Sequence, residues 1–363
     1  MGVVSVIWVV FGFSLAFGDD CGGFIGNPAS FFMFQHVGAK IDTYLAPTIP
    51  LALYALFQMK FAIITPSLIT GSFAERVRFS GYLIFMILFC IFVYCPLAHW
   101  TWHPDGFLRQ MGVVDFAGGI VVHASSGVAA LAGAIFLGRR SGKRHAPANI
   151  PFVILGAAML WLGWFGFNAG SSLAADGIAI KAFLNTNTAS ATAMMVWIFF
   201  DCLRGRKPSA LGAAVGAVVG LVAITPSAGY VTVGESIFIA LTTTMVCNVA
   251  VYWKNKTSVD DALDVFPTHG VGGIFGTVLT GVFVNGLFAG NVSVFLIHLL
   301  AVVLVCGYTF IVSYALYWLT NKMIPLRVSA RSEAIGLDLS QHDESYGYAD
   351  EGERELAEYH AEN

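Results

Sequence analysis

The chain has 363 residues, of which 57% are hydrophobic and only 11% are charged, and its formal net charge is −3. Soluble proteins carry about 25% charged residues, so this composition excludes an ordinary soluble enzyme and a disordered chain. The absence of a broad basic surface also excludes a nucleic-acid binder. The six cysteines have neither metal-site nor disulfide-framework spacing, and we interpret most of them as small apolar residues. The composition indicates a polytopic membrane protein.

The apolar segments are continuous rather than alternating, which favours an all-α fold over strands. A helix needs about 20 mostly apolar residues to cross the hydrocarbon of a bilayer. We predict a transmembrane domain over residues 1–319 and a hydrophilic tail over 320–363. The ten predicted spans are 1–17, 48–74, 81–100, 114–138, 150–170, 185–203, 210–226, 232–253, 264–286 and 292–319.

Lysine and arginine are distributed unequally between alternate connections of these spans. One set of connections, which includes the start of the tail, holds fourteen of them, whereas the opposite set holds only Lys40, Arg109 and Lys181. Cytoplasmic loops are enriched in lysine and arginine. We therefore expect the tail and Met1 to lie on the cytoplasmic side of the plasma (inner) membrane.

Two histidines stand in apolar segments of similar make-up. His123 follows Asp115, and His269 follows Asp264. The two segments enter from opposite sides, as inverted repeats do in transporters whose site lies at the repeat interface. Neutral imidazoles can bind each other and a guest, although each could instead be a helix-packing residue, and Asp115 could be a helix N-cap. Pairing requires the ninth helix to begin near residue 260 or 261, with Asp264 buried.

Aromatic side chains form a second pattern. Phe57 and Phe61 share one face of a helix, Trp102 ends a span on its outer side, and Phe167 precedes Ser171 in another outer half. A lipid-facing aromatic belt accounts for such residues in many membrane proteins. The alternative is an external cation–π cup above a narrow hydrophobic gate.

Six segments in chain order match a known family. They are Phe57-Gln58-Met-Lys-Phe61, Ala98-His99-Trp-Thr-Trp102, Asp115-Phe-Ala-Gly-Gly-Ile-Val-Val-His123, Gly163-Trp164-Phe165-Gly166-Phe167-Asn168-Ala169-Gly170-Ser171, Asp264-Val-Phe-Pro-Thr-His269-Gly and Gly336-Leu-Asp-Leu-Ser. Through them the chain resembles the ammonium transporters of the Amt/Mep/Rh family over nearly its whole length. The resemblance implies that Phe57, Trp102 and Ser171 form an outer ammonium-recruitment site, and that Phe61 and Phe167 form a stacked phenyl gate.

The resemblance also implies that His123 and His269 line the pore as twin histidines, and that Asp115 has a structural and electrostatic role. No cofactor is implied. A dry, apolar pore penalises an unpaired charge by several kcal/mol or more. Ammonium can avoid this penalty by losing a proton, whereas potassium cannot. We therefore expect that ammonium is recruited outside and deprotonated, and that ammonia passes the histidines.

The family's fold has two inverted five-helix repeats plus a long last helix, and its members form homotrimers. Against this pattern the first helix and part of the second are absent, so the first repeat is expected to be incomplete. The segment from Val3 to Phe17 would extend only roughly 22 Å, and we interpret the start as that of a truncated gene model. Lys60, which is next to Phe61 in mid-span, would repel ammonium if it faced the gate, but it could turn to a neighbouring helix or snorkel.

The last 32 residues, 332–363, contain ten acidic residues and one arginine, as a solvated acidic tail would. The resemblance implies that the part through Asp338 packs on the cytoplasmic face and regulates the pore, with a trimeric PII-type signal protein as the partner. The tail is too short for a kinase or cyclase domain.

The predicted function is ammonium transport for nitrogen uptake, without enzymatic activity. An ammonium sensor that acts through a cytoplasmic partner is the alternative. A membrane enzyme with His123, His269 and Asp115 as metal ligands is a third reading, which is disfavoured because no further ligand has suitable spacing.

Overall fold

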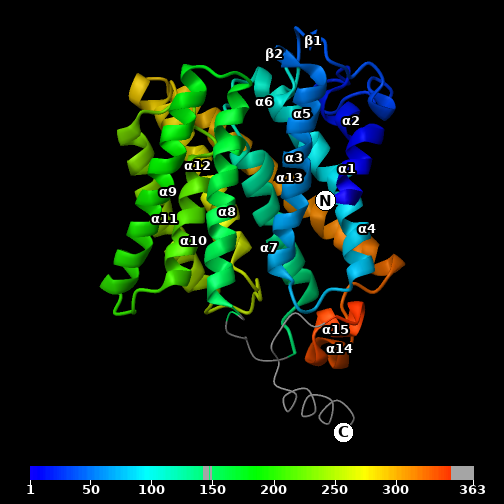
Figure 1. Ribbon diagram of the computed structural model, residues 1–363, viewed down its shortest axis with the longest axis vertical. Coiled ribbons are helices and arrows are strands. Elements are labelled where there is room, and N and C mark those ends of the chain that lie inside the picture. Colours follow the sequence, from blue (N-terminus) through cyan, green and yellow to red (C-terminus); the bar gives the residue numbers. More distant parts are fainter. Residues whose placement is uncertain (142–146, 148, 345–363) are drawn as a thin grey trace.

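The computed structural model describes residues 1–141, 147 and 149–344 and is a bundle of long helices (Figure 1). A hairpin of two short antiparallel strands, β1 (Ile41–Asp42) and β2 (Ala46–Pro50), lies at one end of the bundle. The helices α14 (Ala330–Ile335) and α15 (Leu337–His342) lie at the opposite end. The all-α prediction is confirmed for the bundle, although β2 occupies the first residues of the predicted span 48–74, whose helix begins at Leu51.

The predicted spans of the first half coincide with helices, several of which contain a π-helical turn. The π-helical turns are η1, η4 and η5, and each continues into the helices beside it, so that each set forms one span. The elements η2 and η3 are short 3-10 helices. The elements are α1 (Gly2–Ile7), η1 (Trp8–Gly12), α2 (Phe13–Phe17), η2 (Phe32–Phe34), α3 (Leu51–Ile69), η3 (Thr70–Ser72), α4 (Phe79–Phe89), η4 (Cys90–Tyr94), α5 (Cys95–Trp102), α6 (Phe107–Gln110), η5 (Gly119–Ala124) and α7 (Ser125–Leu137).

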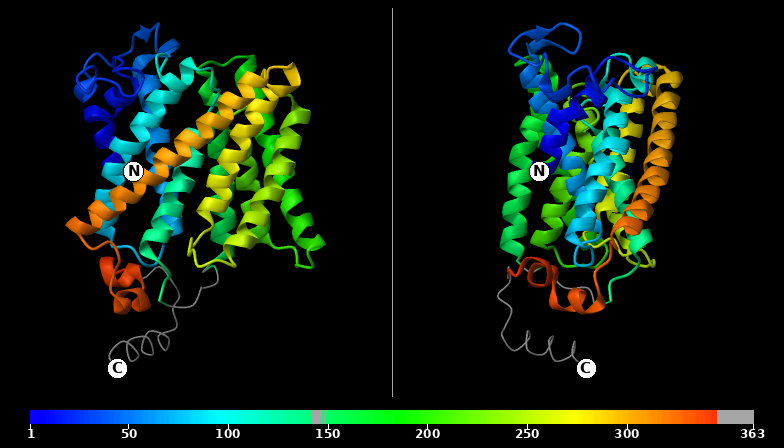
Figure 2. Two further views of the ribbon diagram at one scale, coloured as in Figure 1. Left: turned by 180° about the vertical axis from the view of Figure 1, so that it is seen from behind. Right: turned by 90° about the vertical axis from the view of Figure 1, so that its right-hand side faces the viewer.

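The second half also contains a π-helical turn, η7, which continues into α12, and two short 3-10 helices, η6 and η8. Its elements are α8 (Ile150–Ala169), η6 (Gly170–Ser172), α9 (Gly177–Leu203), α10 (Ala210–Ile224), α11 (Val233–Lys254), η7 (Phe266–Gly270), α12 (Val271–Phe283) and η8 (Leu287–Ala289). The long last helix α13 (Val292–Met323) then crosses the back of the bundle diagonally (Figure 2). It ends at Met323, whereas we predicted that the tail begins at residue 320.

Seven helices within the described residues are long and apolar enough to cross a membrane. The helix over residues 2–17 and α10 are apolar but shorter. Helix α9 has 27 residues, but polar side chains such as Asn185, Thr186 and Ser190 lower its hydropathy. The arrangement is that of a multi-pass membrane protein.

The centre of the bundle is the span formed by η5 and α7. In the most apolar stretch of this span, 83% is buried, compared with 6% in the corresponding stretch of the span formed by α8 and η6. This difference places the segment with His123 in the interior and α8 at the periphery. Residue 123 is 1% exposed.

At the end of the bundle near α14, charged side chains connect three segments. Arg140 donates to both carboxylate oxygens of Asp260 at 2.9 Å and pairs with Glu75. The guanidinium of Arg76, which is fully buried, donates to the carbonyl oxygens of Ser72 and Asp260. This cluster fixes the loop that leads to η7.

The start of the tail packs on the same end, as the resemblance implies. Arg327 pairs with Glu333 at 3.0 Å, and Glu333 accepts the backbone N–H of Ser141. Gln341 on α15 accepts the N–H of Phe79 at 2.7 Å. The six acidic residues in the last part of the predicted acidic tail lie outside the described residues: Asp350, Glu351, Glu353, Glu355, Glu358 and Glu362.

Candidate functional site

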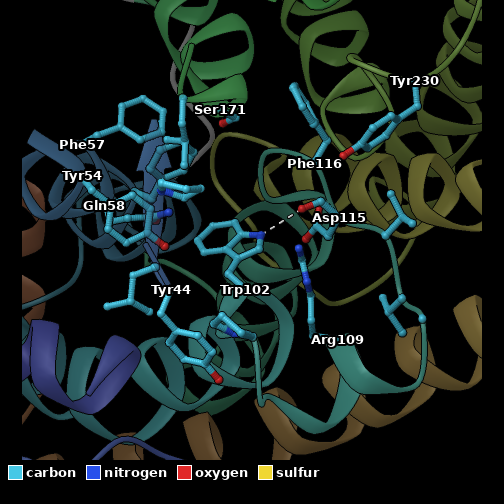
Figure 3. A pocket seen from close by; sticks show the side chains of 18 residues that line it. Tyr44, Tyr54, Phe57, Gln58, Trp102, Arg109, Asp115, Phe116, Ser171 and Tyr230 are labelled. Atoms are coloured by element: carbon cyan, nitrogen blue, oxygen red, sulfur yellow. Dashed lines mark hydrogen bonds between the residues drawn. The ribbon is translucent and has the colours of Figure 1, made fainter. Parts of the chain in front are cut away.

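A cavity of about 550 Å³ opens at the hairpin end of the bundle (Figure 3). Phe57 on α3, Trp102 at the end of α5 and Ser171 in η6 all line it. Three residues that are far apart in the sequence, and that we assigned to one recruitment site, therefore meet at one cavity. Phe61 also lines this cavity and is 2% exposed.

The aromatic rings form a continuous series from the cavity inward. The ring centroids of Phe57 and Phe61 are 4.9 Å apart, and those of Phe61 and Trp102 are 5.5 Å apart. Phe61 and Phe167 approach to 4.4 Å with an interplanar angle of 44°. The expected phenyl pair is thus present, with its rings tilted rather than parallel.

Hydrogen bonds hold two of the cavity side chains in place. The indole N–H of Trp102 donates to the carbonyl oxygen of Asp115 at 2.9 Å. The hydroxyl of Ser171 donates to the carbonyl oxygen of Phe167 at 2.9 Å, which leaves its oxygen free to accept a hydrogen bond. Aromatic faces and one acceptor oxygen suit a small cation that also donates hydrogen bonds.

The carboxylate of Asp115 accepts hydrogen bonds from the backbone. Its two oxygens accept N–H groups of four residues at 2.5–3.2 Å, and the side chain is nearly buried. These donors are the N-cap residue and the first residues of η5, where backbone N–H groups have no intrahelical partner. The four donors are Gly118, Gly119, Ile120 and Val121. This geometry favours the N-cap interpretation of Asp115 over direct contact with a guest.

The two histidines meet in the interior, as expected. The Nδ1 atoms of His123 and His269 are 3.3 Å apart, and the rings are inclined by only 25°. His123 also lies 5.9 Å from Phe167, measured between ring centroids, so the pair follows directly behind the phenyl rings. The Nε2 atom of His123 is buried without a hydrogen-bond partner in the described part of the chain.

The carboxylate that corresponds to Asp115 in the second half is Asp261, not Asp264. Asp261 is fully buried and accepts the N–H groups of Val265 and Phe266 at 3.1 and 2.8 Å, and burial raises its pKa to about 6. It precedes His269 by the same eight residues that separate Asp115 from His123. The expectation that the helix begins near residue 260 or 261 with Asp264 buried is wrong. The helix begins with η7 at Phe266, and the Asp264 side chain is 31% exposed and pairs with Lys254 at 2.6 Å.

A contact between two glycines brings the histidine segments together. A Cβ atom on Gly127 would lie 2.1 Å from the backbone nitrogen of Gly270, the residue after His269. A Cβ atom on Gly273 would lie 2.5 Å from the carbonyl oxygen of Gly119. Only glycine, which has no Cβ atom, allows the two backbones to approach this closely.

For some residues of the site, the sequence analysis predicted no role. Gln58, Arg109 and Tyr230 line the cavity. Gln58 lies in the matched segment from Phe57 to Phe61, whereas nothing in the sequence neighbourhood of Arg109 and Tyr230 distinguishes them as lining residues. Trp164 stacks on His123, with centroids 5.2 Å apart and planes inclined by 14°. The only indication of this role in the sequence was the position of Trp164 within the matched segment Gly163–Ser171.

Two further residues bear on the cavity and the gate. Lys60 is exposed on the outside of α3, whereas its neighbour Phe61 is buried, so the lysine does not face the gate. At the rim of the cavity, the hydroxyl of Tyr44 donates to Asp105, and this hydrogen bond raises the pKa of Tyr44 to about 12. No group of three His, Cys, Asp or Glu side chains with metal-site geometry occurs among residues 1–141, 147 and 149–344.

The chain is similar to known ammonium transporters. The chain is 45% identical over 359 residues to the putative ammonium transporter of Methanothermobacter thermautotrophicus, an alignment that covers 96% of this chain and 87% of that protein. It is 43% identical over 355 residues to an ammonium transporter of Bacillus subtilis, with 95% and 87% covered.

Solved structures share the fold. The crystal structure of Saccharomyces cerevisiae Mep2 matches with a TM-score of 0.85 and 33% identity, over 91% of this chain and 78% of that one. A structure described as a sensor Amt protein matches with a TM-score of 0.85 and 30% identity, over 94% and 87%. The model of the Ammonium Transporter Family matches residues 1–347. The chain therefore belongs to the ammonium transporter family.

Proposed function

We propose that this protein transports ammonium across the plasma membrane by recruiting the ion in the cavity and passing ammonia through the histidine pair. The observation that carries this proposal is the unbroken sequence of Phe57, Phe61, Phe167 and His123 from the cavity into the interior. The proposal assigns the chain to transport rather than to catalysis.

Each part of the path has a physical reason. The faces of Phe57 and Trp102 attract a cation, and the oxygen of Ser171 accepts one of its hydrogen bonds. The phenyl rings of Phe61 and Phe167 exclude water, so a bare charge behind them loses its solvation. Ammonium escapes that cost by giving up its proton, and ammonia can then exchange hydrogen bonds with the imidazoles.

The experiment is uptake of labelled methylammonium into proteoliposomes that contain the full chain. We expect uptake above that of protein-free liposomes and competition by ammonium. If uptake equals the protein-free level in protein that remains folded, the transport proposal is wrong.

A sensor is the second candidate, because a structure described as a sensor Amt protein shares the fold and because α14 and α15 pack on the loops near Phe79 and Ser141. Expression in a strain without its own ammonium transporters separates the two. Rescue of growth on low ammonium supports transport, whereas folded protein without rescue supports the sensor.

We further infer that the tail lies in the cytoplasm, that the subunits form a homotrimer and that a PII-type protein binds the face with α14 and α15. The distribution of basic residues supports the orientation. Membership of the ammonium transporter family supports the homotrimer. Native mass spectrometry of the purified protein tests the trimer.

A further inference from the structure

His298, on the second turn of α13, is a buried imidazole whose two ring nitrogens both have partners. Its Nδ1 lies 2.7 Å from the carbonyl oxygen of Val294, one turn earlier in the same helix. Its Nε2 lies 3.0 Å from the backbone nitrogen of Val114, a residue 184 positions away in the sequence. A carbonyl oxygen can only accept, so Nδ1 carries the proton and donates, while Nε2 accepts the N–H of Val114. The two contacts are satisfied together by one neutral tautomer.

Val114 belongs to a loop that forms one wall of the cavity. Residues 113–116 all line this cavity. The N–H groups of Val113 and Phe116 donate to backbone carbonyl oxygens at 3.0 Å, whereas that of Val114 donates to the imidazole. The long last helix therefore holds the cavity wall through a side chain.

The next residue of this loop, Asp115, connects it to the ring of Trp102. The carbonyl oxygen of Asp115 accepts the indole N–H of Trp102 at 2.9 Å (Figure 3). The position of this oxygen therefore determines how the indole faces the cavity. The carboxylate of Asp115 has separate partners, the N–H groups at the start of η5, so η5 keeps its cap whether or not Val114 is held.

A close contact with α12 restricts the imidazole itself. A Cβ atom on Gly281 would lie 2.8 Å from the Cβ of His298 and 3.1 Å from its Cγ. Glycine at this position therefore allows α12 to pack directly against the histidine. A side chain whose own conformation is fixed by packing can hold another group in a defined place.

We propose that His298 is a positioning residue of the ammonium site, which acts through Val114 on the loop whose Asp115 carbonyl oxygen orients Trp102. This inference rests on the proposed function, in which the cavity recruits the ion. A buried N–H group that loses its acceptor is costly, so without His298 the loop would shift until Val114 found another partner. The indole of Trp102 would then be held less well, and the cavity would bind its guest more weakly.

The test separates binding in the cavity from passage through the pore. The concentration dependence of methylammonium uptake into proteoliposomes gives KM and the maximal rate for wild type and three variants. His298→Phe keeps an aromatic ring but removes both nitrogens, whereas His298→Gln keeps one acceptor and one donor. Thr309→Val on the same helix is the control, because the buried hydroxyl of Thr309 has no hydrogen-bond partner among the described residues.

We expect His298→Phe to raise KM several-fold while the maximal rate stays close to that of wild type, because the change weakens binding in the cavity rather than passage. His298→Gln should retain most of the wild-type affinity, and Thr309→Val should match wild type. A folded His298→Phe protein with unchanged KM overturns the proposal, and so does a His298→Gln protein that is equally impaired. Absence of uptake by folded wild type would instead overturn the transport proposal on which this inference rests.

If His298→Phe does not fold, the tautomer of His298 can be measured directly. Nitrogen NMR of the wild type with labelled histidine, assigned by the signals lost in His298→Gln, should show a protonated Nδ1 and an unprotonated Nε2 at neutral pH. A proton on Nε2 would overturn the proposal, because this nitrogen could not then accept the N–H of Val114.

Discussion

The contact between His123 and His269 determines how their protons are arranged. At 3.3 Å, one Nδ1 must donate and the other must accept, so the rings hold opposite tautomers. Two imidazolium rings would direct N–H groups at each other, which is unfavourable. The pair is therefore best satisfied when both rings are neutral, and a neutral pore does not stabilise a bare cation.

Trp164 gives a first prediction at this scale. It stacks on His123, and its indole N–H donates to the hydroxyl of Thr225 at 3.0 Å. Trp164→Phe removes that hydrogen bond, which contributes about 1 kcal/mol, and lets the imidazole shift. We expect a several-fold lower rate of methylammonium uptake. Trp161→Phe on the same helix is the matched control, because its indole nitrogen has no partner among the described residues. Equal rates for both variants would contradict a positioning role of Trp164.

Individual residues also mark the limit of sequence interpretation. The resemblance implied that His123 and His269 pair, that Phe57, Trp102 and Ser171 form one site, and that Phe61 lies against Phe167. It did not distinguish Asp261 from Asp264, because both acids precede the histidine within a few residues. The backbone N–H groups that decide between them become visible only in three dimensions.

Among the elements, the two π-helical turns η5 and η7 are equivalent. Each begins just after a capping carboxylate and each carries one of the histidines. π-helical turns are rare and frequently occur at functional sites. Hydropathy alone predicted the helices that contain them, but it carried no information about the local change in hydrogen bonding.

The glycine contact between these elements gives the second prediction. Gly127→Ala places a methyl group against the backbone of Gly270, so the two helices must separate. We expect a destabilisation of about 1–3 kcal/mol, as for other overpacked interiors, together with a lower uptake rate. Gly156→Ala in α8 is the control, since no atom lies within 4 Å of a Cβ there. Thermal unfolding midpoints that shift equally in both variants would argue against the close contact.

The whole molecule has two distinct ends, one with the cavity and one with the charged cluster. At the latter, Asp260 joins the loops of both halves through Arg76 and Arg140. Burial alone would raise the pKa of Asp260, but its hydrogen bonds with Arg140 and the charge of Arg76 lower it well below the ordinary value of 3.8. The folded state therefore favours the charged carboxylate.

This shift predicts how stability depends on pH. The contribution of the carboxylate is fully present above pH 3.8 and is lost as the pH falls below that value. Asp260→Asn should destabilise the protein at neutral pH by about 1.5–3 kcal/mol, the contribution of a hydrogen bond to a charged group. Thermal unfolding midpoints of both proteins measured from pH 7 downward should converge in acid. A constant difference would show that the charge of Asp260 is irrelevant.

At the same scale, the sequence predicted a bundle of apolar helices, and the family resemblance implied the packing of the first part of the tail. It could not predict the diagonal course of α13 or the outward position of Lys60, because both depend on packing between distant segments.

The most direct test of the central claim is the selectivity between ammonium and potassium in proteoliposomes with wild type and His123→Ala. If ammonia passes the neutral histidine pair, the variant should change the ammonium rate, its preference over potassium, or both. Lys60→Gln removes an exposed charge of the same span as Phe61 and should behave as wild type. A folded His123→Ala protein with unchanged rate and unchanged selectivity would contradict the proposed mechanism.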